Sequence, residues 1–268
     1  MTWGTRSQHA AGAHAFEPAI SQPTDMDPRG AVAVVTGGAH RLGASIVLAL
    51  AQAGSNVVVN YRASGAAAES TAAQARAAGV NAVTVRADVT RSDEVAGILQ
   101  TTLATFGRAD ILVANAGAFR RTPIATLTEA DWDDMMNGNL RSAFLCAHAF
   151  GLHMRTHAGG TIIMLADVAG MRPWVDYLPY SVAKAGVVAL TRALAKELAP
   201  TVRVNAVAPG PVLFPDGFDP AARQREIART VLQRQGDAHN VAEAVLALIR
   251  NDYITGVVLP VDGGRALT

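Results

Sequence analysis

The chain has 268 residues, half of them hydrophobic, and a formal net charge of +1. This length is enough for one large core, and the balanced charge argues against a surface built for nucleic acid or another polyanion. No apolar stretch reaches the ~18 residues that a membrane span requires, because polar residues or glycine interrupt each run. We therefore expect a soluble, cytoplasmic protein that acts on a small molecule, with no nucleic-acid or membrane partner.

The first thirty residues carry no apolar run long enough for a signal peptide and no regular periodicity. We predict that residues 1–30 form a mobile extension, within which Met26 is a candidate alternative start. No repeat or linker divides the remainder, so residues 31–268 are predicted to form one domain.

From Ala31 onward, short runs rich in β-branched residues alternate with stretches of helical length. The predicted strands are Ala31–Val35, Asn56–Asn60, Ala82–Arg86, Ile111–Ala114, Thr161–Leu165, Val202–Ala206 and Gly256–Pro260. The predicted helices between them include Leu42–Ala53, Ala66–Ala78, Asp93–Phe106 and Tyr180–Leu198. Apolar strands separated by helices indicate an α/β, doubly wound parallel sheet of the Rossmann type, with its ligand crevice at the carboxyl ends of the strands.

Three short patterns predict helix starts. Thr128–Asp131 and Asn240–Glu243 resemble capping boxes, in which a side chain and an acid three residues later satisfy free amides. Asp219 followed by Pro220 is typical of an N-cap before a proline at the first helical position.

A glycine-rich turn, Thr36 to Gly43, follows the first predicted strand and leads into a helix. Glycines there allow the backbone to approach a pyrophosphate, and the free amides of the helix start attract its negative charge. This position in an alternating chain favours a nucleotide site over a merely tight connection.

The end of the second predicted strand distinguishes between the two nicotinamide cofactors. NAD-binding folds place an acid there, but this chain has Asn60, Tyr61, Arg62, Ala63 and Ser64, with no acid before Glu69. Arg62 and Ser64, with His40 on the neighbouring loop, suit a 2′-phosphate, so we predict NADPH.

Tyr180 and Lys184 lie four residues apart at the start of a predicted helix, on one face. A free tyrosine is too weak an acid for proton transfer at neutral pH, and a nearby ammonium group would lower its pKa. The spacing is common by chance and indicates catalysis only together with other motifs.

Those motifs are present in the order of the short-chain dehydrogenase/reductase family, which the chain resembles over residues 31–268. They are the turn Thr36–Gly43, Asn115-Ala116-Gly117, Asn139, Tyr180 with Lys184, Pro209-Gly210 and Asp262-Gly263-Gly264. Four positions depart from the common pattern. They are Arg41 in the turn, Ala114 before Asn115, Phe119, and Asp167 where a catalytic serine is usual.

Arg41, Phe119 and Asp167 look like those of pteridine reductases and dihydromonapterin reductases. The resemblance implies that Asp167, Tyr180, Lys184 and Asn139 are catalytic, with a water held at Asn139. It implies that Arg41, Phe119, Asp167 and Tyr180 contact the substrate. The cofactor contacts it implies are Gly37, His40, Arg41, Leu42, Gly43, Tyr61, Arg62, Ser64, Asp88, Val89, Asn115, Ala116, Gly117, Tyr180, Lys184, Pro209 and Gly210. It also implies a homo-oligomer, commonly a tetramer.

The main hypothesis is an NADPH-dependent reductase of a dihydropterin C=N bond, with Asp167 assisting the proton transfer from Tyr180. One alternative is a carbonyl or 3-oxoacyl reductase of the same family, and another is a non-catalytic NADPH-binding sensor. Asp167 can instead be a structural acid, Phe119 can simply pack the cleft, and Asp88 can cap the next helix.

Two further features have structural interpretations. Cys146, the single cysteine, stands in an apolar run and is predicted to be a packed thiol. His153 and His157 are four residues apart without an acid partner, so we expect no metal site.

Overall fold

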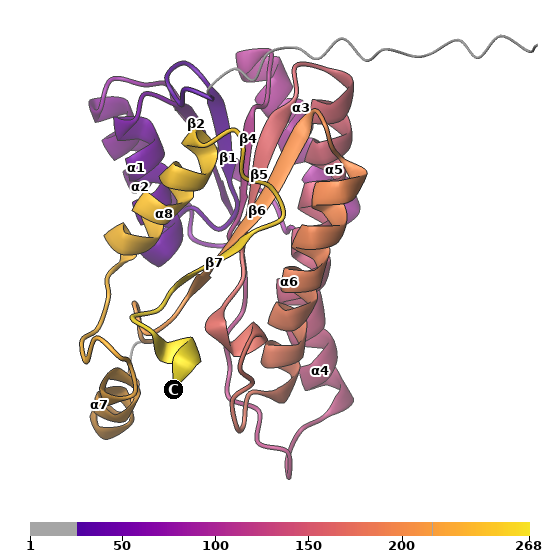
Figure 1. The fold of residues 1–268 in the computed structure, drawn as a ribbon. Helices are drawn as coiled ribbons and strands as arrows, with labels where there is room; N and C mark the ends of the chain where they lie inside the picture. Colours follow the sequence, from indigo (N-terminus) through magenta and orange to yellow (C-terminus); the bar gives the residue numbers. More distant parts are fainter. Residues whose placement is uncertain (1–25, 216) are drawn as a thin grey trace, which may run out of the picture.

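The computed structural model describes residues 26–215 and 217–268. It contains a seven-stranded sheet in the order β3-β2-β1-β4-β5-β6-β7, and every neighbouring pair is parallel (Figure 1). This arrangement confirms the predicted doubly wound sheet. The strands are β1 (Val32–Val35), β2 (Asn56–Tyr61), β3 (Ala82–Arg86), β4 (Ile111–Ala114), β5 (Gly160–Leu165), β6 (Val202–Pro209) and β7 (Val258–Val261).

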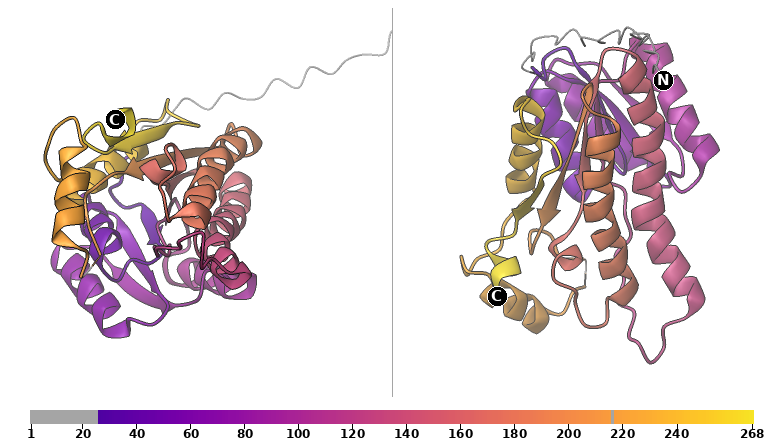
Figure 2. Two further views of the ribbon diagram at one scale, coloured as in Figure 1. Left: turned by 90° about the horizontal axis from the view of Figure 1, so that it is seen from below. Right: turned by 45° about the vertical axis from the view of Figure 1, so that its right-hand side comes forward.

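Helices cover both faces of the sheet (Figures 1 and 2). On one face lie α1 (Arg41–Gln52), α2 (Gly65–Ala77) and α8 (Ala238–Arg250). On the other lie α3 (Ser92–Phe106), α5 (Ser142–Thr156) and α6 (Leu178–Glu197). Two shorter helices, α4 (Glu129–Met136) and α7 (Pro220–Ala228), lie beyond the carboxyl edge of the sheet, toward the bottom of Figure 1.

The central strands are buried on both faces, which explains their continuous apolar sequences. Alternate side chains of one strand enter different cores: Ala33 and Val35 pack with α1 and α8, whereas Val34 packs with the residues of α3 and α5. Phe150 and Cys146 of α5 are buried in this second core. Burial raises the pKa of the Cys146 thiol to about 12, which confirms a packed thiol and not a nucleophile.

Two of the three predicted helix starts are confirmed, and the third is wrong. Thr128 caps α4 in a reciprocal capping box with Asp131, and Asp219 caps α7 ahead of a proline. For α8 the cap is Asp237, whose side chain accepts from Asn240 N while Asn240 bonds back. Asn240 is therefore the third helical residue and not the cap, because Asp237 precedes it at the same spacing.

Residues 26–30 of the predicted extension contact the body of the protein, and residues 1–25 lie outside the described residues. Gly30 N donates to Gly54 O, Ser55 Oγ donates to Pro28 O at 2.7 Å, and Met26 packs against a core. Within the described range, no helix is long and apolar enough to cross a membrane.

Candidate active site

The carboxyl ends of the central strands bring the predicted site residues to one edge of the sheet. The glycine-rich turn follows β1, Asn115 to Phe119 follow β4, Asp167 follows β5, and Pro209 ends β6. In a doubly wound sheet, ligands bind at this edge, where neighbouring connections leave in opposite directions.

The glycine-rich turn is compact because its glycines leave room for neighbouring backbone. Gly37 has φ +60°, and a Cβ there would lie 3.1 Å from Ala116 Cα. A Cβ on Gly43 would lie 2.2 Å from Gly37 O, a clash that no adjustment of a side chain relieves. Asn115 Nδ2 fixes the turn by donating to Thr36 O at 2.8 Å and to Gly37 O at 3.2 Å. The structure therefore brings together Gly37, Gly43, Asn115 and Ala116 as expected.

Two residues that support the turn were not singled out from the sequence. Thr36 Oγ1 accepts from the amides of Asn115 and Ala116 at 3.0 and 2.9 Å. Asn60 Oδ1 accepts from Gly37 N at 3.3 Å, and its Nδ2 donates to carbonyl groups at the end of β3. Both side chains are buried, and the signal for Asn60 was a polar residue inside an otherwise apolar strand.

The end of β2 carries the predicted phosphate-binding residues. Arg62 is exposed and its Nη1 lies 3.6 Å from Asp88 Oδ2. Ser64 immediately precedes α2 and makes no capping hydrogen bond with its side chain. Burial raises the pKa of Asp88, but hydrogen bonds from Thr90 and the charge of Arg62 outweigh it and hold that pKa below its usual value. Asp88 does not cap α3, whose N-cap is Arg91, so the structural alternative for Asp88 is not supported.

The groups around this edge fit a phosphorylated dinucleotide. The turn offers free amides at the start of α1, and the described residues at the end of β2 include a cation and a hydroxyl group but no acid. A pocket of about 680 Å³ at this edge is lined by Arg62, Thr90, Ala118 and Arg141, among others, and of the predicted cofactor contacts it includes Arg62. Leu42, Tyr61 and Val89 are partly or fully buried beside the turn and pack in the cores, whereas His40 is exposed at the start of α1.

Replacing Arg62 with alanine is expected to weaken NADPH binding by about 10- to 100-fold, the usual size of a charge-assisted hydrogen-bond pair. Binding of NADH should be nearly unchanged, because NADH lacks the 2′-phosphate. Fluorescence titration with both cofactors measures the two dissociation constants. The matched control is Arg192→Ala, which removes an exposed arginine of α6. Equal losses for NADPH and NADH in the Arg62 variant would contradict the assignment.

Tyr180 and Asp167 are joined directly. Tyr180 Oη donates to Asp167 Oδ2 at 2.8 Å, and Asp167 Oδ1 accepts from Ala169 N at 2.7 Å. Asp167 precedes the short η2 turn (Val168–Gly170), which follows β5, and Tyr180 lies in the first turn of α6. Burial raises the pKa of Asp167, although the amide of Ala169, the charge of Lys184 and the Tyr180 bond lower it in part. Burial is the largest of these effects, so the acid form of Asp167 persists above the usual range of aspartic acids.

Lys184 is buried behind Tyr180, one helical turn further along α6. Its Nζ donates to Leu165 O at 2.7 Å and lies 5.8 Å from the centre of the Tyr180 ring. Burial lowers the pKa of Lys184 to about 8, against a smaller opposite effect of Asp167.

The pKa of Tyr180 differs from the expectation. The nearby ammonium group was expected to lower it, but burial and the adjacent Asp167 raise the pKa of Tyr180 well above its usual value. The reason is that Lys184 faces the ring from behind while the hydroxyl group faces a carboxyl group. A neutral phenol is the form that donates a proton, which suits Tyr180 to the role of proton donor in a reduction.

Asn139 lies in a π-helical segment (Asn137–Arg141) between α4 and α5, a type of helical bulge that is frequent at functional sites. Its side chain is fully engaged: Oδ1 accepts from Ala118 N, and Nδ2 donates to Ala118 O and Met135 O at 2.9 Å each. These bonds hold the segment that carries Phe119. The expected water at Asn139 stays a prediction.

Phe119 belongs to an aromatic cluster that lies against Tyr180. Its ring stacks on Tyr177 at 4.8 Å and meets Tyr180 edge-on at 5.0 Å, while Trp174 contacts Phe119 and Tyr177 edge-on. Phe119 is 40% exposed, so part of the cluster is open to solvent. Trp174 and Tyr177 were not singled out from the sequence, although Tyr177 immediately precedes α6, three residues before Tyr180.

Arg41 and the Pro209–Gly210 pair border the site from the opposite side. Arg41 has φ 54°, in the left-handed region that favours glycine, and its Nη2 donates to Phe214 O at 3.2 Å. Pro209 ends β6, and Gly210 N donates to Val261 O at 3.0 Å. Among residues 26–215 and 217–268, no three His, Cys, Asp or Glu side chains are grouped to hold a metal ion.

Comparisons with known proteins agree with this architecture. A family model described as enoyl-(acyl carrier protein) reductase matches residues 37–266. The 3-oxoacyl-[acyl-carrier-protein] reductase of Synechocystis is 39% identical over 240 residues, which cover 88% of this chain and 97% of that protein. A 3-oxoacyl-[acyl-carrier-protein] reductase of Staphylococcus aureus is 35% identical and covers 87% of this chain and 96% of its own length.

A solved structure shows the same fold. A double mutant of a Serratia marcescens short-chain dehydrogenase/reductase has a TM-score of 0.84 and 32% sequence identity, with 90% of this chain and 99% of that chain covered. The family model spans residues 37–266 and so includes the helix of Tyr180 and Lys184 and most of the glycine-rich turn. The protein belongs to the short-chain dehydrogenase/reductase family.

Proposed function

We propose that this protein is an NADPH-dependent reductase that adds hydride to a polarised C=O or C=N bond and supplies the proton from Tyr180. The observation that carries the proposal is the neutral, buried phenol of Tyr180, bonded to Asp167 at 2.8 Å and backed by Lys184. The family of the chain supports an oxidoreductase, and the absence of an acid from the described residues at the end of β2 supports NADPH.

When bound, NADPH supplies the hydride that becomes a new C–H bond of the substrate. The free amides of the glycine-rich turn would hold its pyrophosphate, Arg62 and Ser64 would hold the 2′-phosphate, and Lys184 would hold the ribose. Tyr180 gives its hydroxyl proton to the oxygen or nitrogen that gains the electron pair of the double bond. Asp167 keeps the Tyr180 hydroxyl group oriented, and solvent returns the proton afterwards.

A carbonyl compound of the 3-oxoacyl type is the first candidate substrate. Several relatives support it, among them the 3-oxoacyl-[acyl-carrier-protein] reductases of Synechocystis and Staphylococcus aureus. Ketone reduction requires one proton at oxygen, which Tyr180 alone provides. In this reaction Asp167 takes the part usually played by serine and orients the hydroxyl group.

A dihydropterin is the second candidate, and features of the site itself favour it. Reduction of its C=N bond puts a proton on nitrogen, and Asp167, whose pKa burial raises, is the candidate second proton source beside Tyr180. A flat ring also suits the exposed face of Phe119, and Arg41 lies near the rim. The resemblance of Arg41, Phe119 and Asp167 to pteridine reductases supports the same substrate.

Oxidation of NADPH in the presence of a substrate panel separates these candidates. The panel contains acetoacetyl-CoA, simple ketones, dihydrobiopterin and dihydromonapterin, with Tyr180→Phe as the inactive control. Turnover of thioesters and ketones alone selects the first candidate, and turnover of dihydropterins selects the second. Tight NADPH binding without any turnover would identify the non-catalytic sensor and sink the enzymatic proposal. A homo-oligomer, proposed from the family resemblance, is tested on the same sample by light scattering.

A further inference from the structure

Helix α7 lies apart from the sheet, next to the C-terminal end of the chain (Figures 1 and 2). None of its nine residues is buried. An isolated helix of this length is unstable in water, and most helices in proteins gain their stability from packing of an apolar face. Polar contacts must therefore determine where α7 sits.

The strongest of these contacts joins α7 to Arg265. The Nε and Nη2 atoms of Arg265 donate to Glu226 Oε2 at 3.1 and 3.0 Å, and Nη1 donates to Thr268 O at 3.3 Å. The side chain of Arg265 is only 7% exposed, and that of Glu226 is 29% exposed. A guanidinium group with so little contact with solvent needs its carboxylate partner to compensate its charge. An exposed ion pair differs, because water solvates each partner when the other is removed.

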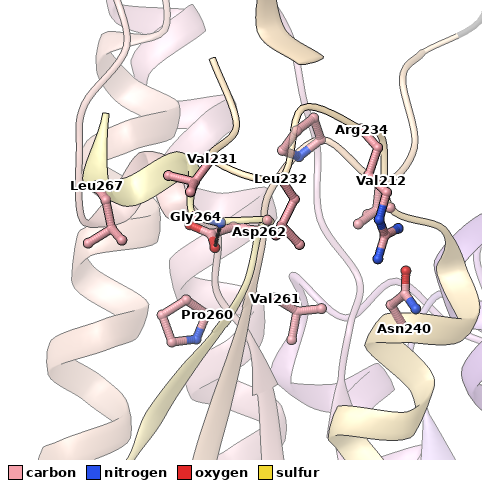
Figure 3. Close-up of a pocket in the computed structure, with 13 residues that line it drawn as sticks. Val212, Val231, Leu232, Arg234, Asn240, Pro260, Val261, Asp262, Gly264 and Leu267 are labelled. Atoms are coloured by element: carbon pink, nitrogen blue, oxygen red, sulfur yellow. Dashed lines mark hydrogen bonds between the residues drawn. The ribbon is translucent and has the colours of Figure 1, made fainter. Parts of the chain in front are cut away.

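Further hydrogen bonds join the C-terminal residues to backbone atoms at the end of α7 and just after it. Thr268 Oγ1 donates to Arg229 O at 2.5 Å, at the end of α7, and Leu232 N donates to Gly263 O at 3.0 Å. Figure 3 shows Val231 and Leu232 beside Asp262 and Gly264, around a pocket of about 420 Å³. The C-terminal residues thus support both α7 and the segment that follows it.

The segment that precedes α7 contacts the glycine-rich turn of the candidate active site. Arg41 of the glycine-rich turn donates to Leu213 O and Phe214 O, just before α7. Arg223 of α7 lies 5.5 Å from the centre of the Phe214 ring. The segment before α7 therefore joins this helix to the glycine-rich turn.

We propose that Arg265 is a positioning residue: its forked contact with Glu226 fixes α7 at the mouth of the site and thereby determines how tightly substrate binds. The inference rests on the proposed function for the location of the substrate. Arg265 touches neither cofactor nor substrate in this account. It acts on substrate binding through Glu226, so the cofactor affinity is independent of it.

The test compares Arg265→Gln and Glu226→Gln with a matched control, Arg229→Gln. Arg229 Nη1 also contacts Glu226, at 2.7 Å, but this arginine is 60% exposed and immediately follows α7. In the first two variants we expect the amides of residues 221–228 to exchange hydrogen at least about tenfold faster, with those of β5 and β6 unchanged. The control should behave like the parent protein.

The kinetic result expected is a rise of about tenfold in KM for whichever substrate of the panel is reduced, with an unchanged KM for NADPH. Exchange of the charges in Glu226→Arg/Arg265→Glu should recover part of the loss.

If Arg265→Gln fails to fold, the Glu226→Gln variant provides the test, since no residue of α7 is buried. Unchanged exchange at α7, or a parallel rise in exchange throughout the sheet and in both KM values, would overturn the inference. The hydrogen-exchange experiment needs no substrate, so it tests the role of Arg265 by itself. Failure of the proposed function would instead appear as absence of turnover with the substrate panel.

Discussion

Tyr180→Phe is expected to lower kcat for the reduction of any accepted substrate by about 10²- to 10⁴-fold, the usual contribution of a positioned acid. The phenol is the group whose proton completes the reaction, and phenylalanine keeps the ring that packs against Phe119. The loss should therefore appear in kcat, measured by steady-state oxidation of NADPH.

Two measurements show that this loss is chemical. The dissociation constant for NADPH should be nearly unchanged, because the turn, Arg62 and Lys184 are intact. The thermal unfolding temperature should change little, since only a hydroxyl group is removed. An active Tyr180→Phe variant, within a few-fold of the parent, would mean that another group donates the proton.

Replacement of Asp167 is expected to have the second-largest effect, and the effect depends on the substrate. If a dihydropterin is reduced, Asp167→Asn should lower kcat by about 10²- to 10⁴-fold, because an amide supplies no proton. If a 3-oxoacyl group is reduced, Asp167→Ser should retain most of the activity, because serine still orients the Tyr180 hydroxyl group. Both variants are assayed on both substrate classes.

The pH dependence gives an independent check on Asp167. Burial raises the pKa of this carboxyl group, so its acid form persists above the usual range of aspartic acids and is lost as the pH rises through that pKa. Reduction of a C=N bond should therefore slow with rising pH, and this limb of the kcat profile should vanish in Asp167→Asn. A profile with the same limb in parent and variant would assign the titration to another group.

The alternation of strands and helices could be predicted from the sequence because every central strand is buried on both faces and reads as a continuous apolar run. The positions of Tyr180 and Lys184 followed equally well, since residues four apart on a helix share a face. The α8 cap was missed because Asp237 and Asn240 are both good capping residues at overlapping spacings.

The parts that the sequence could not supply depend on contacts between distant residues. The pKa of Tyr180 depends on which atom of the ring faces Lys184 and which faces Asp167, and spacing along one helix does not determine this. Likewise, Asn60 supports a turn 23 residues earlier, and Arg265 pairs with Glu226 39 residues earlier. No local pattern marks such pairs, because they arise only when the sheet and the C-terminal turn are assembled.

The central claim is that hydride from NADPH reaches a substrate carbon beside the phenol of Tyr180. NADPH carrying deuterium at both C4 positions of the nicotinamide tests it directly, with the substrate of the panel that is turned over. We expect one deuterium atom per product molecule on the carbon of the former double bond, seen by NMR and mass spectrometry, and labelled product formed at least about 100-fold more slowly by Tyr180→Phe. Product free of deuterium, or labelled product formed by the Tyr180→Phe variant at the parent rate, would contradict the claim.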